Sequence, residues 1–150
     1  MPKLEELYLQ ANLIQQFNGW EGGLPSLKRL NLRRNKIANL DDELPELPEL
    51  EWLNLRHNAI ESIEVCFKVF QWPKIIDLNI LNNPCDQNCS SFNLLMAKFL
   101  VKRPGLQRFC KEKVTERHQL EAVHLGHFMW DEAEKKRKAD DAAAAANPDD

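Results

Sequence analysis

Four cysteines and four histidines are the side chains of this sequence that could hold a metal ion or act as nucleophiles. Cys85 and Cys89 lie four residues apart, and His57 or His118 could add a third zinc ligand. Structural zinc sites usually combine two close pairs of ligands, and no second close pair accompanies these cysteines. We therefore favour local packing over metal binding, and predict neither a metal nor a cofactor.

Catalytic chemistry has equally little support in the sequence. His124 and His127 would share one face of a helix, but no acidic or thiol partner converges on them. There is no glycine-rich phosphate loop and no nucleophile elbow. We predict that the chain is not an enzyme and has no catalytic residues.

The composition narrows the classes of partner. The formal net charge is −3 and 43% of the residues are hydrophobic, which argues against binding a polyanion directly or lying on a membrane surface. No run approaches the roughly 18 apolar residues of a membrane span. The first residues lack the apolar core of a secretory signal, so we expect an intracellular chain with reduced, largely buried thiols.

A repeated pattern dominates the first half of the chain. The spacing LxxLxLxxNxI begins at Leu4, Leu27 and Leu50, and a degenerate copy begins at Ile75. The alternating Leu-x-Leu predicts a short strand with one buried face, and the asparagine marks the turn that follows it. A single coil of this kind cannot bury its apolar side, so the coils must stack. The pattern predicts an α/β solenoid of about four repeats with a short parallel sheet on its concave side.

Other segments of the chain would complete the stack. Prolines at Leu24-Pro25, Leu44-Pro45 and Leu47-Pro48 predict short helical or 3-10 turns on the convex side, and residues 65–72 predict one or two helical turns. Ser90 or Ser91 would cap a helix that starts near Phe92 and stops at Pro104-Gly105. We therefore assign residues 1–110 to the repeat domain, with its C-terminal cap at 84–110.

The two ends of the chain differ. Residues 112–138 predict one long charged helix, assigned as a segment of its own at 111–138, and 139–150 predict a low-complexity, poorly ordered tail. No cap is visible at the N-terminal end, where Leu4, Leu7 and Leu9 would lie on an open edge strand. We expect upstream repeats or another protein to cover that edge.

The residues between the consensus leucines should face the concave surface, which four strands make only about 20 Å wide. The middle two coils are basic there, and exposed arginine and aromatic residues often dominate the energy of interfaces. Our hypothesis is that this face holds a helix or an acidic segment of another protein. The alternative is a solvated polar face with no partner. The predicted partner-binding residues are Tyr8, Arg29, Arg33, Arg34, Trp52, Arg56 and His57.

The period of 22–23 residues with Asn-x-Ile resembles the intracellular class of leucine-rich repeats found in phosphatase-regulatory, dynein light-chain and splicing-associated proteins. Three segments are similar to the leucine-rich-repeat protein of ciliary and flagellar radial spokes. They are Pro2-Lys3-Leu4-Glu5-Glu6-Leu7-Tyr8-Leu9, Leu53-Asn54-Leu55-Arg56-His57-Asn58 and Leu81-Asn82-Asn83-Pro84-Cys85-Asp86. This resemblance implies a non-enzymatic scaffold in the axoneme, docked to neighbouring spoke subunits through its concave face and C-terminal helix.

Two other functions remain open at this point. A splicing ribonucleoprotein-type repeat protein would be nuclear, and its cap is followed by a charged helix similar to the segment at 113–117. A phosphatase-regulatory subunit would be found in the cytosol or nucleus.

Overall fold

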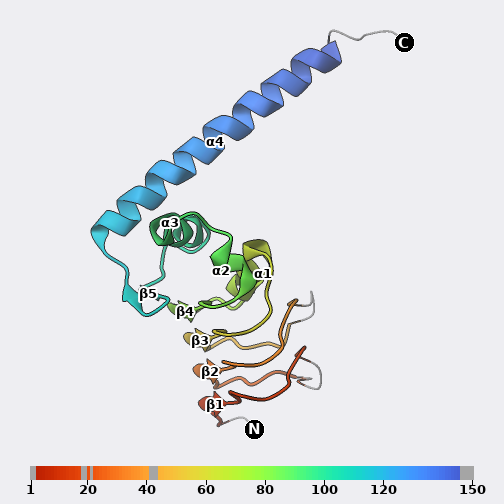
Figure 1. The fold of residues 1–150 in the computed structure, drawn as a ribbon, viewed down its shortest axis with the longest axis vertical. Helices are drawn as coiled ribbons and strands as arrows, with labels where there is room; N and C mark the ends of the chain where they lie inside the picture. Colours follow the sequence, from red (N-terminus) through yellow and green to blue (C-terminus); the bar gives the residue numbers. More distant parts are fainter. Residues whose placement is uncertain (1–2, 18–19, 21, 41–43, 146–150) are drawn as a thin grey trace.

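The computed structural model describes residues 3–17, 20, 22–40 and 44–145. Four parallel strands form the concave side of a stack of coils (Figure 1). They are β1 (Glu6–Tyr8), β2 (Arg29–Asn31), β3 (Trp52–Asn54) and β4 (Asp77–Asn79). The central leucines pair in register from strand to strand, so that Leu30 lies between Leu7 and Leu53. The predicted four-coil solenoid is confirmed.

The sheet continues into the cap, which the sequence did not predict. β5 (Arg108–Phe109) pairs parallel with β4, and β6 (Glu112–Lys113) then turns back antiparallel to β5. Cys110 and Lys111 make the two-residue turn with φ of 51° and 71°. Such turns favour asparagine or glycine because both central residues need positive φ. Neither residue type is present, so the hairpin had no local sequence signal.

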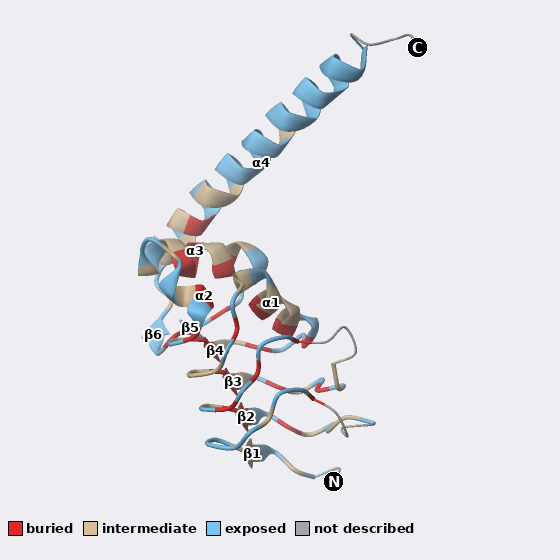
Figure 2. Ribbon diagram, turned by 45° about the vertical axis from the view of Figure 1, so that its right-hand side comes forward, coloured by how far each residue is buried: buried red, intermediate tan, exposed pale blue. Residues whose placement is uncertain are grey.

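The core consists of the consensus apolar residues, and it is sealed at the cap end. Leu30, Leu53, Leu78 and Phe109 follow one another along the stack, and all are at most 1% exposed. Leu7, on the edge strand β1, is only partly buried. Figure 2 shows the buried segments concentrated in the middle coils and the cap. Met1 and Pro2, part of the predicted N-terminal edge, lie outside the described residues.

The consensus asparagines form a ladder of side-chain hydrogen bonds. The Asn35 amide nitrogen donates to the carbonyl of Leu32 in its own coil and to that of Leu9 in the preceding coil, both at 3.0 Å. Its side-chain oxygen accepts the backbone N–H of Ile14 at 3.1 Å. Asn58 and Asn83 repeat this arrangement one and two coils further on. The ladder satisfies backbone groups that would otherwise be buried without partners.

The residue before each ladder asparagine has a left-handed backbone. Ala11, Arg34, His57 and Asn82 have φ values of 59°, 58°, 57° and 60°. Side chains other than glycine, asparagine and aspartate are strained in this region. The strand therefore leaves the sheet through the same sharp turn in all four coils.

Among the described residues of the first three coils, helices on the convex side occur in the third coil. α1 (Ile63–Phe67) and the 3-10 helix η1 (Lys68–Gln71) cover the coil where residues 65–72 predicted helical turns. In the two preceding coils, Leu24–Leu27 and Leu47–Leu50 each close one turn through an i+3 to i hydrogen bond of 3.3 Å. The prolines of these coils prevent the turns from extending into helices.

The cap contains two helices besides β5. α2 (Pro84–Gln87) follows the last ladder asparagine, and α3 (Phe92–Lys102) begins at the N-cap Ser91, one of the two predicted capping residues. Arg103 ends α3, and its guanidinium donates to four carbonyls of the segment at 70–75, at 2.8 to 3.2 Å. Burial lowers the pKa of Arg103. This contact fastens the cap to the convex side of the stack.

The C-terminal helix α4 (Glu116–Ala145) differs from the prediction at both ends. It starts later than residue 112, because Glu112 and Lys113 belong to β6 and the Thr115 hydroxyl accepts the N–H of His118 at the new helix start. It also continues through 139–145, where a poorly ordered tail was predicted, because alanine has the highest helix propensity. Residues 146–150 of that tail lie outside the described residues, and the division at 111–138 and 139–150 stays a prediction.

The first turns of α4 pack on α3, with Ala122 buried between them, and the rest projects away from the stack (Figure 1). None of the described helices is long and apolar enough to cross a membrane.

Candidate protein-binding surface

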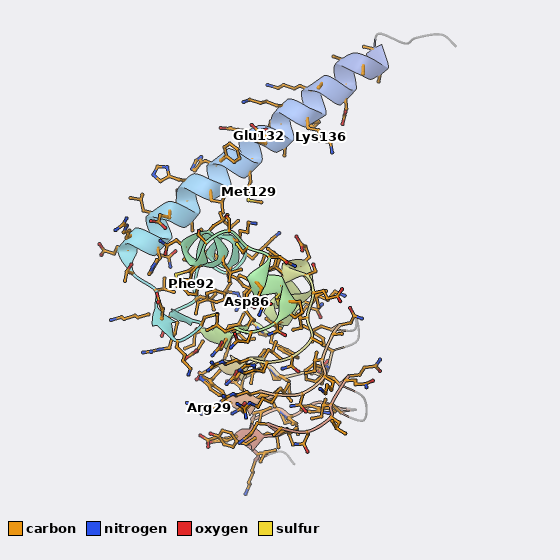
Figure 3. All side chains as sticks on the ribbon, in the orientation of Figure 1. Arg29, Asp86, Phe92, Met129, Glu132 and Lys136 are labelled. Atoms are coloured by element: carbon orange, nitrogen blue, oxygen red, sulfur yellow. The ribbon has the colours of Figure 1, made fainter. Side chains whose placement is uncertain are left out.

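The strand register arranges the concave side chains in rows across the coils. The first row contains Glu6, Arg29, Trp52, Asp77 and Arg108, one from each strand from β1 to β5. Figure 3 shows Arg29 on the strand side of the stack. We call this row, together with Glu5, Lys28 and Glu51 just before it, the leading edge. It lies where the chain enters the sheet.

A middle row follows, with Tyr8 beside Asn31, Asn54 and Asn79. Sequence alternation predicted that these asparagines face the concave surface, where they would be open to a partner. Instead, each side-chain oxygen accepts a backbone N–H two residues ahead, as Asn54 does from Arg56 at 2.9 Å. Asn54 and Asn79 are buried as a result. The repeated Leu-Asn-Leu spacing was the signal for this second set of turn-forming asparagines.

At the other end of the strands lies a cluster of positive charge, which we call the arginine edge: Arg33, Arg34, Arg56 and His57. Arg34 donates its backbone N–H to the carbonyl of Arg56 at 2.9 Å, which holds the two coils side by side here. No salt bridge joins Arg33, Arg34 or Arg56 to an acidic group among the described residues. The Nε atoms of Arg33 and Arg56 are buried without a hydrogen-bond partner there.

The pKa of His57 is affected by the positive charge of the arginine edge. Desolvation lowers the pKa of its imidazole, and the positive charges of Arg56, Arg34 and Arg33 lower it further. Its Nε2 lies 3.3 Å from the Asn82 amide nitrogen. The site therefore disfavours a further positive charge and favours a bound anion.

The leading edge differs from the arginine edge in charge, because each of its basic side chains lies beside an acidic one. Arg29 lies 4.0 Å from the Glu6 carboxylate and stacks over the Trp52 ring at 4.6 Å. Arg108 lies 3.9 Å from Asp77, whose pKa is raised by burial although both arginines lower it. Sequence reasoning missed Arg108, because it belongs to the unpredicted strand β5.

The predicted site residues thus fall into three places rather than one basic centre. Arg33, Arg34, Arg56 and His57 come together, while Arg29 and Trp52 form a stacked pair at the opposite end of the strands. Tyr8 lies alone between them on β1, and its hydroxyl donates to Glu6 at 3.2 Å. The face has two chemically distinct ends.

In the part of the chain that the structure describes, no three or more histidine, cysteine or acidic residues are placed to share a metal ion. The sulfur atoms of Cys66 and Cys85 lie 3.8 Å apart in the core, and burial raises the pKa of Cys110 to about 12. Metal binding needs the thiolate, which burial disfavours. These thiols act as apolar core side chains.

Known proteins share this fold. The family model described as "Leucine rich repeat" matches residues 2–60 and again residues 25–84, which together exceed half of the chain. A chain in the crystal structure of the Drosophila melanogaster SNF/U2A′ complex is similar, with a TM-score of 0.71 and 21% identity over 85% of this chain and 74% of that one. A chain in the structure of Chaetomium Mex67:Mtr2 subunits aligns with a TM-score of 0.43 and 18% identity, over 66% of this chain and 64% of that one. No curated protein matches the sequence.

Proposed function

Because the chain belongs to the leucine-rich repeat family, we propose that it is a scaffold that holds another protein against its concave sheet and catalyses no reaction. Members of this family are generally modules for protein interaction rather than enzymes. The proposed binding residues are the arginine edge, the Arg29–Trp52 pair and Tyr8.

The arginine edge is the observation that carries this proposal. Arg33 and Arg56 occupy equivalent positions of adjacent coils, where like charges side by side destabilise a sheet. Their buried Nε atoms lack acceptors among the described residues, which adds to the unfavourable energy. Arginine pairs with carboxylates through two parallel hydrogen bonds. An acidic helix or segment of a partner protein would relieve the repulsion between the two guanidinium groups.

Charge reversal tests the proposed partner. Arg33→Glu combined with Arg56→Glu should abolish co-purification of the bound protein from the native cell, with an unchanged far-UV circular dichroism spectrum. The control variant exchanges Glu49 and Lys74 for one another. These two exposed residues form an ion pair with 2.7 Å between Lys74 Nζ and Glu49 Oε2 and do not belong to the arginine edge, so this variant should retain the partner. An equal yield of partner with the reversed variant would contradict the proposal.

The projecting half of α4 is proposed as a second docking surface. Phe128, Met129 and Trp130 are 62%, 47% and 64% exposed, an unusual concentration of apolar area for a helix in water. Figure 3 shows Met129 on this half, followed by Glu132 and Lys136. A neighbouring subunit would cover these side chains and leave the charged residues to set its orientation.

The assembly that we propose is the radial spoke of cilia and flagella, with neighbouring spoke subunits as partners. Support comes from the Asn82-Asn83-Pro84-Cys85 segment, which leads from β4 into α2, and from the charged helix that follows the cap. The protein would then be found in the axoneme.

A splicing ribonucleoprotein is the second candidate, favoured by the fold likeness to a chain of the SNF/U2A′ complex. A phosphatase-regulatory subunit is the third candidate, because proteins of that function share the repeat period of 22–23 residues. A fluorescent fusion distinguishes these functions: axonemal signal supports the spoke, nuclear speckles support the ribonucleoprotein, and diffuse signal with co-purifying phosphatase activity supports the third. Signal that excludes the axoneme would contradict the spoke assignment.

A further inference from the structure

The two edges of the concave face differ in charge along the direction of the strands. The arginine edge carries three arginines and no acidic residue. The leading edge carries four acids and three bases, and each base lies within 4.0 Å of an acid from the neighbouring coil: Lys28 with Glu5, Arg29 with Glu6, and Arg108 with Asp77. The fourth acid, Glu51, has no ion-pair partner among the described residues. The leading edge therefore has a slight excess of negative charge.

The leading edge also has a hollow in which a side chain could lie. It has a volume of about 230 Å³ and is lined by Trp52, by the Glu5–Lys28 and Glu6–Arg29 pairs, and by Glu51, Ile76 and Asp77. Arg29 stacks on the Trp52 ring at 4.6 Å, which already places one cation against this aromatic group. Carboxylates beside an aromatic ring are suited to a lysine or arginine side chain.

We propose that the occupant of the concave face is a helix lying along the strands, with acidic residues over the arginine edge and a lysine or arginine in the hollow beside Trp52. This inference rests on the proposed function and specifies the charge pattern of its partner. Trp52 and Arg56 are four residues apart, which corresponds to about 13 Å at the rise of a strand. About nine residues of a helix span that distance, so the partner's basic and acidic groups are separated by two to three turns.

Synthetic peptides provide the probe for this charge pattern. One dye-labelled alanine-based helix carries two lysines in its first turn and three glutamates two to three turns later. A second helix has the same composition with its charges interleaved. The full chain should bind the first peptide roughly tenfold more tightly than the second, measured by fluorescence anisotropy at low salt.

Reversing the edges of the protein tests the geometry. Arg33→Glu with Arg56→Glu should abolish the preference for the first peptide, and so should Glu6→Lys with Glu51→Lys. Combining all four substitutions should restore it, because the peptide then binds in the opposite direction. Arg33→Gln with Arg56→Gln provides a neutral variant that keeps the test valid if the charge reversals impair folding.

The outcomes separate this inference from the proposed function. If both peptides bind the wild-type chain equally, or if the fourfold variant fails to restore the preference, the charge-polarised occupant is wrong and an acidic partner of another arrangement still stands. If neither peptide binds, and a helix with glutamates alone does not bind either, the acidic partner itself is overturned.

Discussion

Asn83 has no exposed surface, and its side chain serves three backbone groups in two coils. Its amide nitrogen donates to Leu55 and Ile80 at 2.9 and 2.8 Å, and its oxygen accepts from Ile60 at 3.1 Å. Asn12, at the other end of the ladder, is exposed, and its bonds within the described part of the chain are to carbonyls of its own coil, Leu9 and Gln10. The asparagine at this consensus position is therefore expected to contribute more to stability in the buried coils than at the exposed end of the stack.

Replacing Asn83 with alanine should lower the free energy of unfolding by about 3 kcal/mol, because it leaves buried backbone groups without partners. Asn12→Ala should lower it by no more than about 1 kcal/mol, since water can replace its bonds. Urea unfolding followed by circular dichroism measures both. Equal losses for the two variants would mean that burial does not determine the strength of the ladder.

At the scale of single residues, the sequence predicted those positions that follow from the spacing of the repeat alone. It placed the basic residues in the middle two coils and marked each consensus asparagine as the point where the chain turns out of the strand. It did not predict that Glu6 pairs with Arg29, or that Asn54 turns inward to its own backbone. Those contacts depend on side-chain rotamers and on neighbouring coils, which a one-dimensional pattern does not contain.

Among the elements, the loop between β1 and β2 has a close backbone contact at Gly23. Its φ is +68°, and a Cβ atom there would lie 2.1 Å from the Glu46 carbonyl oxygen of the next coil. The Leu24 N–H donates to that same oxygen at 3.0 Å. Gly126, within α4, is the opposite case, because a Cβ there would meet Val101 at 3.9 Å, an ordinary van der Waals contact.

Gly23→Ala should therefore destabilise the protein by about 1–3 kcal/mol, through strain at positive φ and displacement of the adjacent coil. Gly126→Ala should stabilise it by about 0.5–1 kcal/mol, because alanine is the better helix former and the space is free. Thermal unfolding of the two variants should shift in opposite directions. A shift in the same direction would contradict one of the two backbone assignments.

Elements with a strong period were predictable and short irregular ones were not. The strands β1–β4, the helix α3 and its cap followed from spacing and capping residues. The hairpin of β5 and β6 did not, because Cys110 and Lys111 adopt positive φ only when the stack holds them there. That hairpin also explains why α4 begins four residues later than predicted.

At the scale of the whole molecule, α4 is divided into a packed and a projecting half (Figure 2). Its one buried residue is Ala122, and from His127 to Ala145 every described residue is exposed except Glu134. The aromatic residues of the projecting half do not contribute to the core of the stack. The solenoid and its cap should be stable without them.

A chain truncated after Gly126 should consequently keep its urea midpoint within experimental error, while its radius of gyration decreases in small-angle X-ray scattering. The control truncation, after Lys113, also removes Ala122 and the contact of α4 with α3, and should lower the midpoint. A loss of stability with the first truncation would show that the projecting half packs on the stack in solution.

At the left-handed turns that follow the strands, the residues proposed for binding are not the ones that would give the most stable backbone. Arg34 and His57 occupy backbone positions that asparagine or glycine would adopt with less strain, as Asn82 does one coil further on. Laboratory evolution for thermostability alone would be expected to replace both residues and so remove half of the arginine edge. Under such selection, retention of Arg34 and His57 would have to come from a requirement for the bound partner.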